Sequence, residues 1–122
     1  MAKILVIDDS SFMRHQVRSF LEEAGFEVEE FLPLSALEVV ERVRASVPDL
    51  ILSDFNMPEV DGQSVARMAK RANPDIPVII LTATRDAAKE SVLGTIGVRR
   101  VLHKPIGGET LIQAVKEVLR IP

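Results

Sequence analysis

Short apolar runs recur along the chain and alternate with longer stretches in which apolar residues are spaced as on one face of a helix. The runs are rich in Val, Ile and Leu, a composition typical of strands that are covered on both faces in a parallel sheet. They occupy residues 4–7, 50–52, 78–81 and 101–102. A fifth segment, residues 27–31, is more polar and predicts an edge strand.

Five stretches have the apolar spacing of amphipathic helices. They are residues 12–24, 35–46, 63–72, 86–95 and 109–120. Chain-breaking residues fall between the segments, with Gly25 after the first helical stretch and Pro48 after the second. The pattern therefore predicts five βα units, whose right-handed crossovers build a doubly wound α/β sheet.

Polar residues stand at the points where the predicted strands end. The groups at four of these ends are Asp8 with Asp9, Asp54, Thr82 and Lys104. In doubly wound sheets, ligands bind beyond the carboxyl ends of the strands. We therefore expect these five side chains to converge at one edge of the sheet.

Three carboxylates at one edge raise each other's pKa unless a cation neutralises them. Mg²⁺ prefers oxygen ligands and is commonly held by one or two carboxylates together with phosphate oxygens. A lysine ammonium and a threonine hydroxyl donate hydrogen bonds that phosphate oxygens accept. Taken singly, each group also has an ordinary explanation as a helix cap, a turn residue or a strand threonine. Those explanations account poorly for one such group at each strand end.

Composition excludes several classes of protein. The 122 residues suit one domain, residues 1–122, and the formal charge of −3 lacks the basic excess used to bind nucleic acid. Cysteine is absent, which excludes disulfides, thiolate zinc sites and cysteine nucleophiles. The N-terminal apolar run is far too short to span a membrane, so we expect a cytoplasmic protein without membrane contact.

The strand-end motifs resemble those of the receiver domains of two-component response regulators, and the resemblance covers essentially the whole chain. The motifs are ILVIDDS at residues 4–10, LSDFNMP at 52–58, DG at 61–62, LTA at 81–83 and KP at 104–105. The resemblance implies a flavodoxin-like sheet of strand order 2-1-3-4-5 flanked by five helices. It also implies a cis peptide bond between Lys104 and Pro105.

The resemblance further implies a role for each polar group. Asp54 is implied to be the phosphoacceptor. Asp9, Asp54 and the main-chain carbonyl of Asn56 are implied to be Mg²⁺ ligands, while Asp8 acts mainly through metal-bound water and orientation. Lys104 is implied to pair with Asp54 before phosphorylation and with a phosphoryl oxygen afterwards.

Other positions concern the lifetime and transmission of the signal. The resemblance implies that Thr82 is the switch residue, which moves toward the phosphoryl group, and that Asn56 and Thr84 flank the path of the hydrolytic water. Thr84 is short and uncharged, which predicts an intermediate phosphoryl lifetime. Receivers usually carry an aromatic residue where this chain has Val101, and valine has few rotamers. We therefore expect phosphorylation to alter the backbone of residues 82–89, with little change at Val101.

The implied phosphoryl donor is a phosphohistidine on a sensor histidine kinase or phosphotransfer protein, and a downstream target protein is implied to read the modified state. Because the covalent product is itself the signal, we expect a regulatory phosphoacceptor rather than an enzyme. The sequence stops at Pro122, just after the last helical stretch. We therefore expect either docking to a separate target or an excised receiver.

Two alternatives remain open. A Mg²⁺-dependent phosphatase of the haloacid-dehalogenase type also uses an aspartyl nucleophile, but places a second acid where this chain has Asn56. A pseudo-receiver, kept only as a protein-binding module, does not require the competent residues that all five site positions hold.

Two histidines and a basic cluster complete the candidates. We expect His15 on a helix surface and His103 near the site in a structural role. The basic cluster comprises Arg85, Lys89, Arg99 and Arg100. These residues mark either the output face usual in the family or merely a solvated surface.

Overall fold

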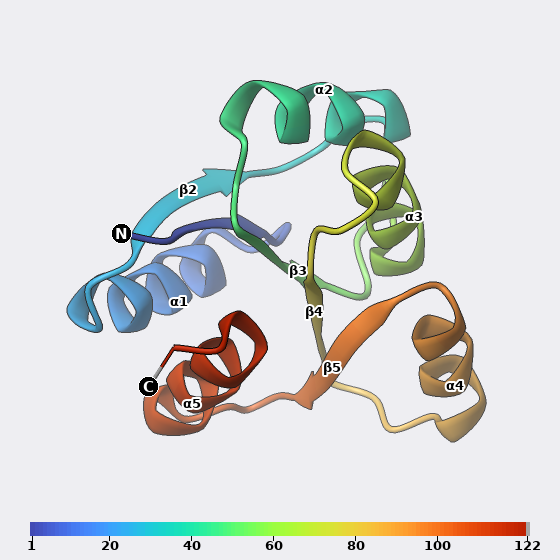
Figure 1. Ribbon diagram of the computed structural model, residues 1–122. Coiled ribbons are helices and arrows are strands. Elements are labelled where there is room, and N and C mark those ends of the chain that lie inside the picture. The colour runs from blue at the N-terminus through green and yellow to red at the C-terminus, as the bar shows by residue number, and fades with distance from the viewer. Residues whose placement is uncertain (122) are drawn as a thin grey trace.

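The computed structural model describes residues 1–121 and contains a five-stranded parallel sheet of order β2-β1-β3-β4-β5 (Figure 1). The strands are β1 (Lys3–Ile7), β2 (Glu27–Phe31), β3 (Leu50–Asp54), β4 (Val78–Thr82) and β5 (Val98–His103). The doubly wound fold, its strand order and the edge position of β2 are therefore confirmed. No helix among residues 1–121 is long and apolar enough to cross a bilayer.

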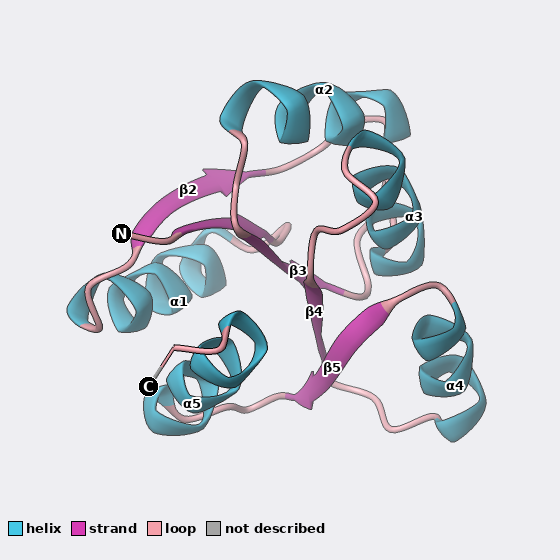
Figure 2. Cartoon of the chain, in the orientation of Figure 1, coloured by secondary structure: helices cyan, strands magenta, loops and turns pink. Residues whose placement is uncertain are grey.

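Five helices cover the two faces of the sheet (Figure 2). They are α1 (Ser11–Glu23), α2 (Ala36–Ser46), α3 (Gly62–Ala72), α4 (Ala87–Thr95) and α5 (Gly108–Leu119). Helices α1 and α5 pack on one face, and α2, α3 and α4 pack on the other. The helical spacing in the sequence located each helix to within about two residues, which is the usual uncertainty of helix ends.

The central strands divide the core into two clusters because successive side chains point to opposite faces. On β1, Leu5 and Ile7 join the cluster beneath α2, α3 and α4, whereas Ile4 and Val6 join the cluster beneath α1 and α5. Helix α4 contributes least to this packing, since Leu93 is its one fully buried side chain among the described residues.

Strand β5 differs from the expectation. The apolar run predicted only residues 101–102, covered on both faces, but the strand begins at Val98 and is the second edge of the sheet. Arg99 and Arg100 are exposed within it, while Val101 is only partly buried. An edge strand tolerates charged side chains, so the start of β5 contains two arginines and cannot be recognised from a run of apolar residues.

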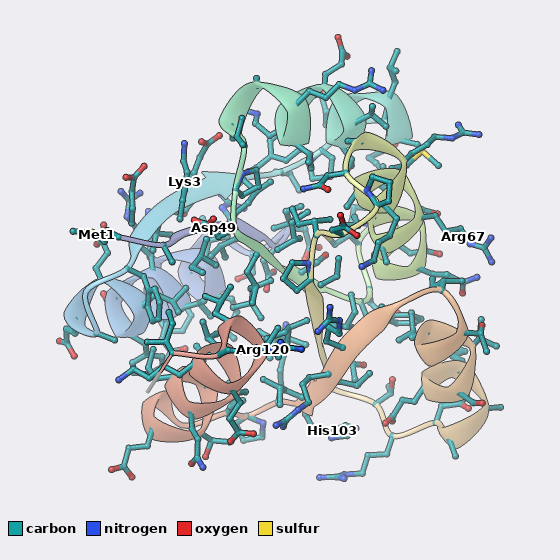
Figure 3. All side chains as sticks on the ribbon, viewed as in Figure 1. Met1, Lys3, Asp49, Arg67, His103 and Arg120 are labelled. Atoms are coloured by element: carbon teal, nitrogen blue, oxygen red, sulfur yellow. The ribbon has the colours of Figure 1, made fainter. Side chains whose placement is uncertain are left out.

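Local contacts fix where the elements begin. Ser10, Asp61 and Asp86 each accept a main-chain N–H at the start of a helix, as N-cap residues do. At the amino ends of the strands, the carboxylate of Asp49 accepts the N–H of Lys3 at 2.7 Å, which joins the starts of β1 and β3 (Figure 3). The three N-cap residues lie in the loops after β1, β3 and β4, and these loops also carry polar motifs.

Candidate functional site

Three carboxylates meet at the carboxyl edge of the sheet. Asp8 and Asp9 follow β1, Asp54 ends the neighbouring β3, and one oxygen of each lies within 4.8 Å of the others. Asp8 and Asp54 are buried, whereas Asp9 is exposed. The convergence expected of these acids is therefore present.

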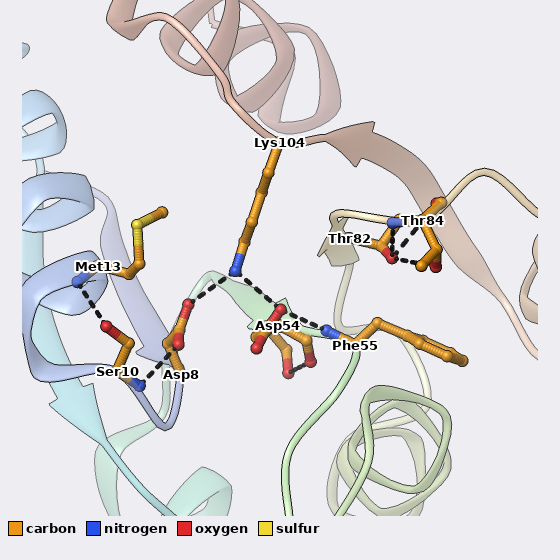
Figure 4. A network of polar contacts seen from close by, with 9 residues as sticks. Asp8, Ser10, Met13, Asp54, Phe55, Thr82, Thr84 and Lys104 are labelled. Atoms are coloured by element: carbon orange, nitrogen blue, oxygen red, sulfur yellow. Dashed lines mark hydrogen bonds and ion pairs between the residues drawn. The ribbon is translucent and has the colours of Figure 1, made fainter.

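Lys104 reaches into this cluster from the loop after β5. Its Nζ lies 2.9 Å from Asp54 Oδ1 and 3.4 Å from Asp8 Oδ2 (Figure 4). The Lys104–Pro105 peptide bond is cis, as expected. The main-chain N–H of Lys104 donates to the carbonyl of Thr82 at 2.8 Å, which ties the lysine to the end of β4.

The charges of the site are strongly coupled. Burial and the charges of Asp8 and Asp9 raise the pKa of Asp54 despite the hydrogen bond from Lys104. Burial opposes the charge on Lys104, but its hydrogen bond to Asp54 and the charges of Asp54 and Asp8 outweigh it and raise the Lys104 pKa. Burial thus disfavours the charged form of both groups: at Asp54 it acts together with the neighbouring acids, whereas at Lys104 those acids outweigh it.

Thr82 is buried at the end of β4, but its hydroxyl faces its own loop. Thr82 Oγ1 accepts the N–H of Thr84 at 3.2 Å and lies 3.1 Å from Thr84 Oγ1. In Figure 4 these contacts lie to one side of the Asp54–Lys104 pair. The hydroxyl also lies 3.4 Å from the Thr84 carbonyl, to which it can donate, so its contacts are with its own loop.

The loop that carries Asn56 is closed at its base. The N–H of Gly62 donates to the carbonyl of Phe55 at 2.7 Å, and a Cβ at Gly62 would lie 2.8 Å from both the carbonyl of Asp54 and the Cα of Phe55. The absence of a side chain at Gly62 therefore allows the start of α3 to pack directly against the end of β3. Asn56 is exposed on this loop.

The residues of β5 contribute differently from one another. His103 pairs with Thr82 in the sheet, and its Nε2 lies 3.0 Å from Glu90 Oε2 on α4. This contact lowers the pKa of Glu90. His103 thus links the sheet to α4, which is a structural role of the kind expected for it. The other histidine, His15, lies exposed on α1, where it was expected. Val101 is partly buried against the core.

Sequence reasoning missed Arg14. Its Nη1 donates to the main-chain carbonyl of Asp8, and its Nε donates to Glu30 on β2 at 3.3 Å. The signal in the sequence is weak, because a single arginine in an amphipathic helix is normally read as a solvated residue. Its contact with Glu30 also depends on the docking of α1 against the edge strand β2.

The three acids suit a hard divalent cation. Their oxygen atoms are close enough to share one ion, and Lys104 supplies only one positive charge against three carboxylates. The donor set is all oxygen, which favours Mg²⁺ over softer metals.

Comparison with known proteins agrees with this arrangement. The family model of the response regulator receiver domain matches residues 4–116. The response regulator MprA of Mycobacterium ulcerans (strain Agy99) is 34% identical over 119 residues, covering 97% of this chain and 50% of that protein. The chain therefore spans about half the length of the curated relatives it matches.

Solved structures show the same fold. The chemotaxis protein CheY4 of Vibrio cholerae has a TM-score of 0.86 and 30% identity, with 97% of this chain and 98% of that chain covered. A response regulator receiver domain protein from Clostridium thermocellum also has a TM-score of 0.86 and 30% identity, with 98% and 95% covered. The chain belongs to the response regulator receiver domain family, a regulatory family of two-component systems.

Proposed function

We propose that this receiver accepts a phosphoryl group on Asp54 in the presence of Mg²⁺ and changes its partner-binding surface as a result. The observation that carries the proposal is the buried Asp54 carboxylate, hydrogen-bonded to Lys104 within a cluster of three acids. A nucleophile, a cation site and a phosphate-binding ammonium are thereby combined at one edge of the sheet.

Asp9, Asp54 and the Asn56 carbonyl would hold Mg²⁺, with Asp8 orienting its bound water. The ion offsets negative charge on the acceptor and on the phosphoryl oxygens. Asp8 is prepared for its role, because its Oδ1 accepts the N–H of Ser10 at 2.9 Å and its Oδ2 faces Lys104.

In the proposed transfer, an oxygen of Asp54 forms a bond to phosphorus as the phosphorus–nitrogen bond of the donor phosphohistidine breaks. The electron pair of that bond returns to the imidazole, which leaves. Lys104 then moves its hydrogen bond from the carboxylate to a phosphoryl oxygen. Its raised pKa keeps it cationic throughout at neutral pH.

Signal transmission in this proposal begins at Thr82. Its hydroxyl leaves Thr84 for a phosphoryl oxygen, which draws the loop after β4 and the start of α4 toward Asp54. Val101 offers no aromatic ring to reorient, so the change is centred on residues 82–89. A sensor histidine kinase or phosphotransfer protein supplies the phosphoryl group, and a downstream target protein reads the altered surface.

The test is incubation of the protein with Mg²⁺ and a small phosphodonor such as acetyl phosphate, followed by intact-mass measurement. We expect one added phosphoryl group per chain, on the peptide that contains Asp54, and none when the cation is chelated. Absence of the adduct would instead favour the pseudo-receiver alternative, a module that only binds other proteins. Repeated turnover of a phosphate ester would instead indicate the phosphatase alternative.

The exposed position of Thr84 beside Thr82 supports a role in phosphoryl lifetime. Thr84→Glu should accelerate loss of the phosphoryl group by roughly tenfold, equivalent to about 1.4 kcal/mol of barrier, because a carboxylate there accepts a hydrogen bond from the attacking water. The measurement is decay of the phosphorylated mass after the donor is removed. Thr84→Ala is the control without an added charge, and equal decay in all three proteins would remove Thr84 from the hydrolytic path.

A further inference from the structure

Arg14 joins the acidic loop to the edge strand of the sheet. The side chains of Arg14 and Glu30 are only 17% and 15% exposed, so this contact is largely removed from water. Glu30 also accepts from Arg18 Nη1 at 3.0 Å, and His15 Nε2 lies 3.7 Å from it. Glu30 is thus held in place by neighbours on α1, which makes it a firm support for the Arg14 guanidinium.

The carbonyl that Arg14 holds belongs to the peptide unit between Asp8 and Asp9. The side chain of Asp8 has its own supports in Ser10 and Lys104. The exposed carboxylate of Asp9 has no hydrogen bond or ion pair with any group of residues 1–121. Its position therefore depends on the backbone that carries it, which Arg14 holds at the Asp8 carbonyl and the Asp8 carboxylate holds at the Ser10 N–H.

We propose that Arg14 is a positioning residue for the divalent cation, acting through the Asp8–Asp9 peptide and supported by Glu30. The inference rests on the proposed function, which assigns the cation to these acids. Arg14 does not contact the cation. Its guanidinium uses two nitrogens in different directions, one toward the Asp8 carbonyl and one toward Glu30, which a lysine ammonium on a flexible stem does not reproduce.

The sign of the effect separates positioning from simple charge. A cation near the acids is repelled by Arg14, so removing the positive charge should strengthen Mg²⁺ binding if charge were its only contribution. Loss of positioning should weaken binding instead, because Asp9 would no longer be held in a ligating position. The two effects therefore predict opposite changes in affinity.

The experiment measures Mg²⁺ affinity directly by isothermal titration calorimetry on the unphosphorylated chain, with Mn²⁺ electron paramagnetic resonance as a second readout. Arg14→Ala should raise the Kd roughly tenfold, the usual cost of losing a group that supports a metal ligand. Arg14→Lys keeps the charge and should also weaken binding. Arg18→Ala is the matched control: it removes an equal charge that also contacts Glu30 but not Asp8, and it should leave the Kd within about twofold.

A double-mutant cycle completes the test. In an Asp9→Ala background, Arg14→Ala should cause no further loss of affinity, because the residue that it positions is already absent. Circular dichroism of each variant checks the fold, and Arg14→Lys carries the test if Arg14→Ala does not fold. Unchanged or tighter Mg²⁺ binding by the folded Arg14 variants would overturn the inference. Failure of the parent protein to bind Mg²⁺ at all would instead overturn the proposed function.

Discussion

Asp54→Asn is expected to abolish phosphoryl uptake and, without a divalent cation, to raise the free energy of unfolding at neutral pH. The first result follows because an amide oxygen is too weak a nucleophile to replace the carboxylate. The second follows because burial and two neighbouring acids make the charged form of Asp54 unfavourable in the folded protein, as its raised pKa indicates. The amide removes this unfavourable charge and still accepts a hydrogen bond from Lys104.

The pH dependence has a defined sign. The folded pKa of Asp54 lies above that of an ordinary aspartate, so its contribution to stability is present at low pH and is lost as pH rises through the folded pKa. The free energy of unfolding of the Asp54→Asn protein should therefore exceed that of the parent most at neutral pH, and this difference should shrink on acidification. Urea unfolding in the presence of a chelator, at several pH values, measures this difference and its dependence on pH.

A matched control is Asp75→Asn, which removes an exposed acid that precedes the start of β4, whereas the site lies at the ends of the strands. It should leave phosphoryl uptake unchanged. Modification of the Asp54→Asn protein at another residue would contradict the assigned acceptor. If the parent protein is more stable than the Asp54→Asn protein at neutral pH, the electrostatic account of the cluster is wrong.

Gly62→Ala is expected to lower the free energy of unfolding by about 1–3 kcal/mol, the usual cost of overpacking a well-packed site. The added Cβ would lie 2.8 Å from two backbone atoms, the carbonyl oxygen of Asp54 and the Cα of Phe55, and neither can rotate away as a side chain does. Relief requires α3 or the end of β3 to move. Because Asp54 ends β3, phosphoryl uptake should also slow.

Gly94→Ala provides the control for this substitution. Gly94 lies in α4 with no atom within 4 Å of an added Cβ, so alanine there should raise stability by roughly 0.5–1 kcal/mol. Thermal unfolding of the two variants distinguishes the sites. Equal stability of the Gly62→Ala protein and the parent would show that the loop and α3 adjust without cost.

Much of the fold could be predicted because its pattern is local. Strands β1, β3 and β4 and the five helices follow from apolar spacing and chain breakers, since a strand covered on both faces has few polar positions. The edge strand β5 was only partly predicted because Arg99 and Arg100 tolerate solvent there. The convergence of Asp8, Asp9 and Asp54 was predictable because parallel strands end at one edge.

Side-chain direction could not be predicted in the same way. The sequence indicates that Thr82 ends a strand, but not that its hydroxyl bonds Thr84. The same motif is compatible with a hydroxyl that faces Thr84 and with one that faces Asp54. The contact of Arg14 with Glu30 depends on the packing of α1 against β2. The contact of His103 with Glu90 likewise depends on how α4 packs against β5.

The weak anchoring of α4 has a consequence for local opening of the native state. Helices α1, α3 and α5 each bury two or more side chains, whereas α4 buries only Leu93 among the described residues and is joined to β5 by the His103–Glu90 contact. Segments with few buried apolar contacts open with the smallest free energies, and their amides exchange fastest with solvent. Amide hydrogens of α4 should therefore exchange ahead of those in α1, α3 and α5. Because α2 and α3 each bury several side chains in the cluster to which α4 adds only Leu93, most of the cover on this face of the sheet remains when α4 opens.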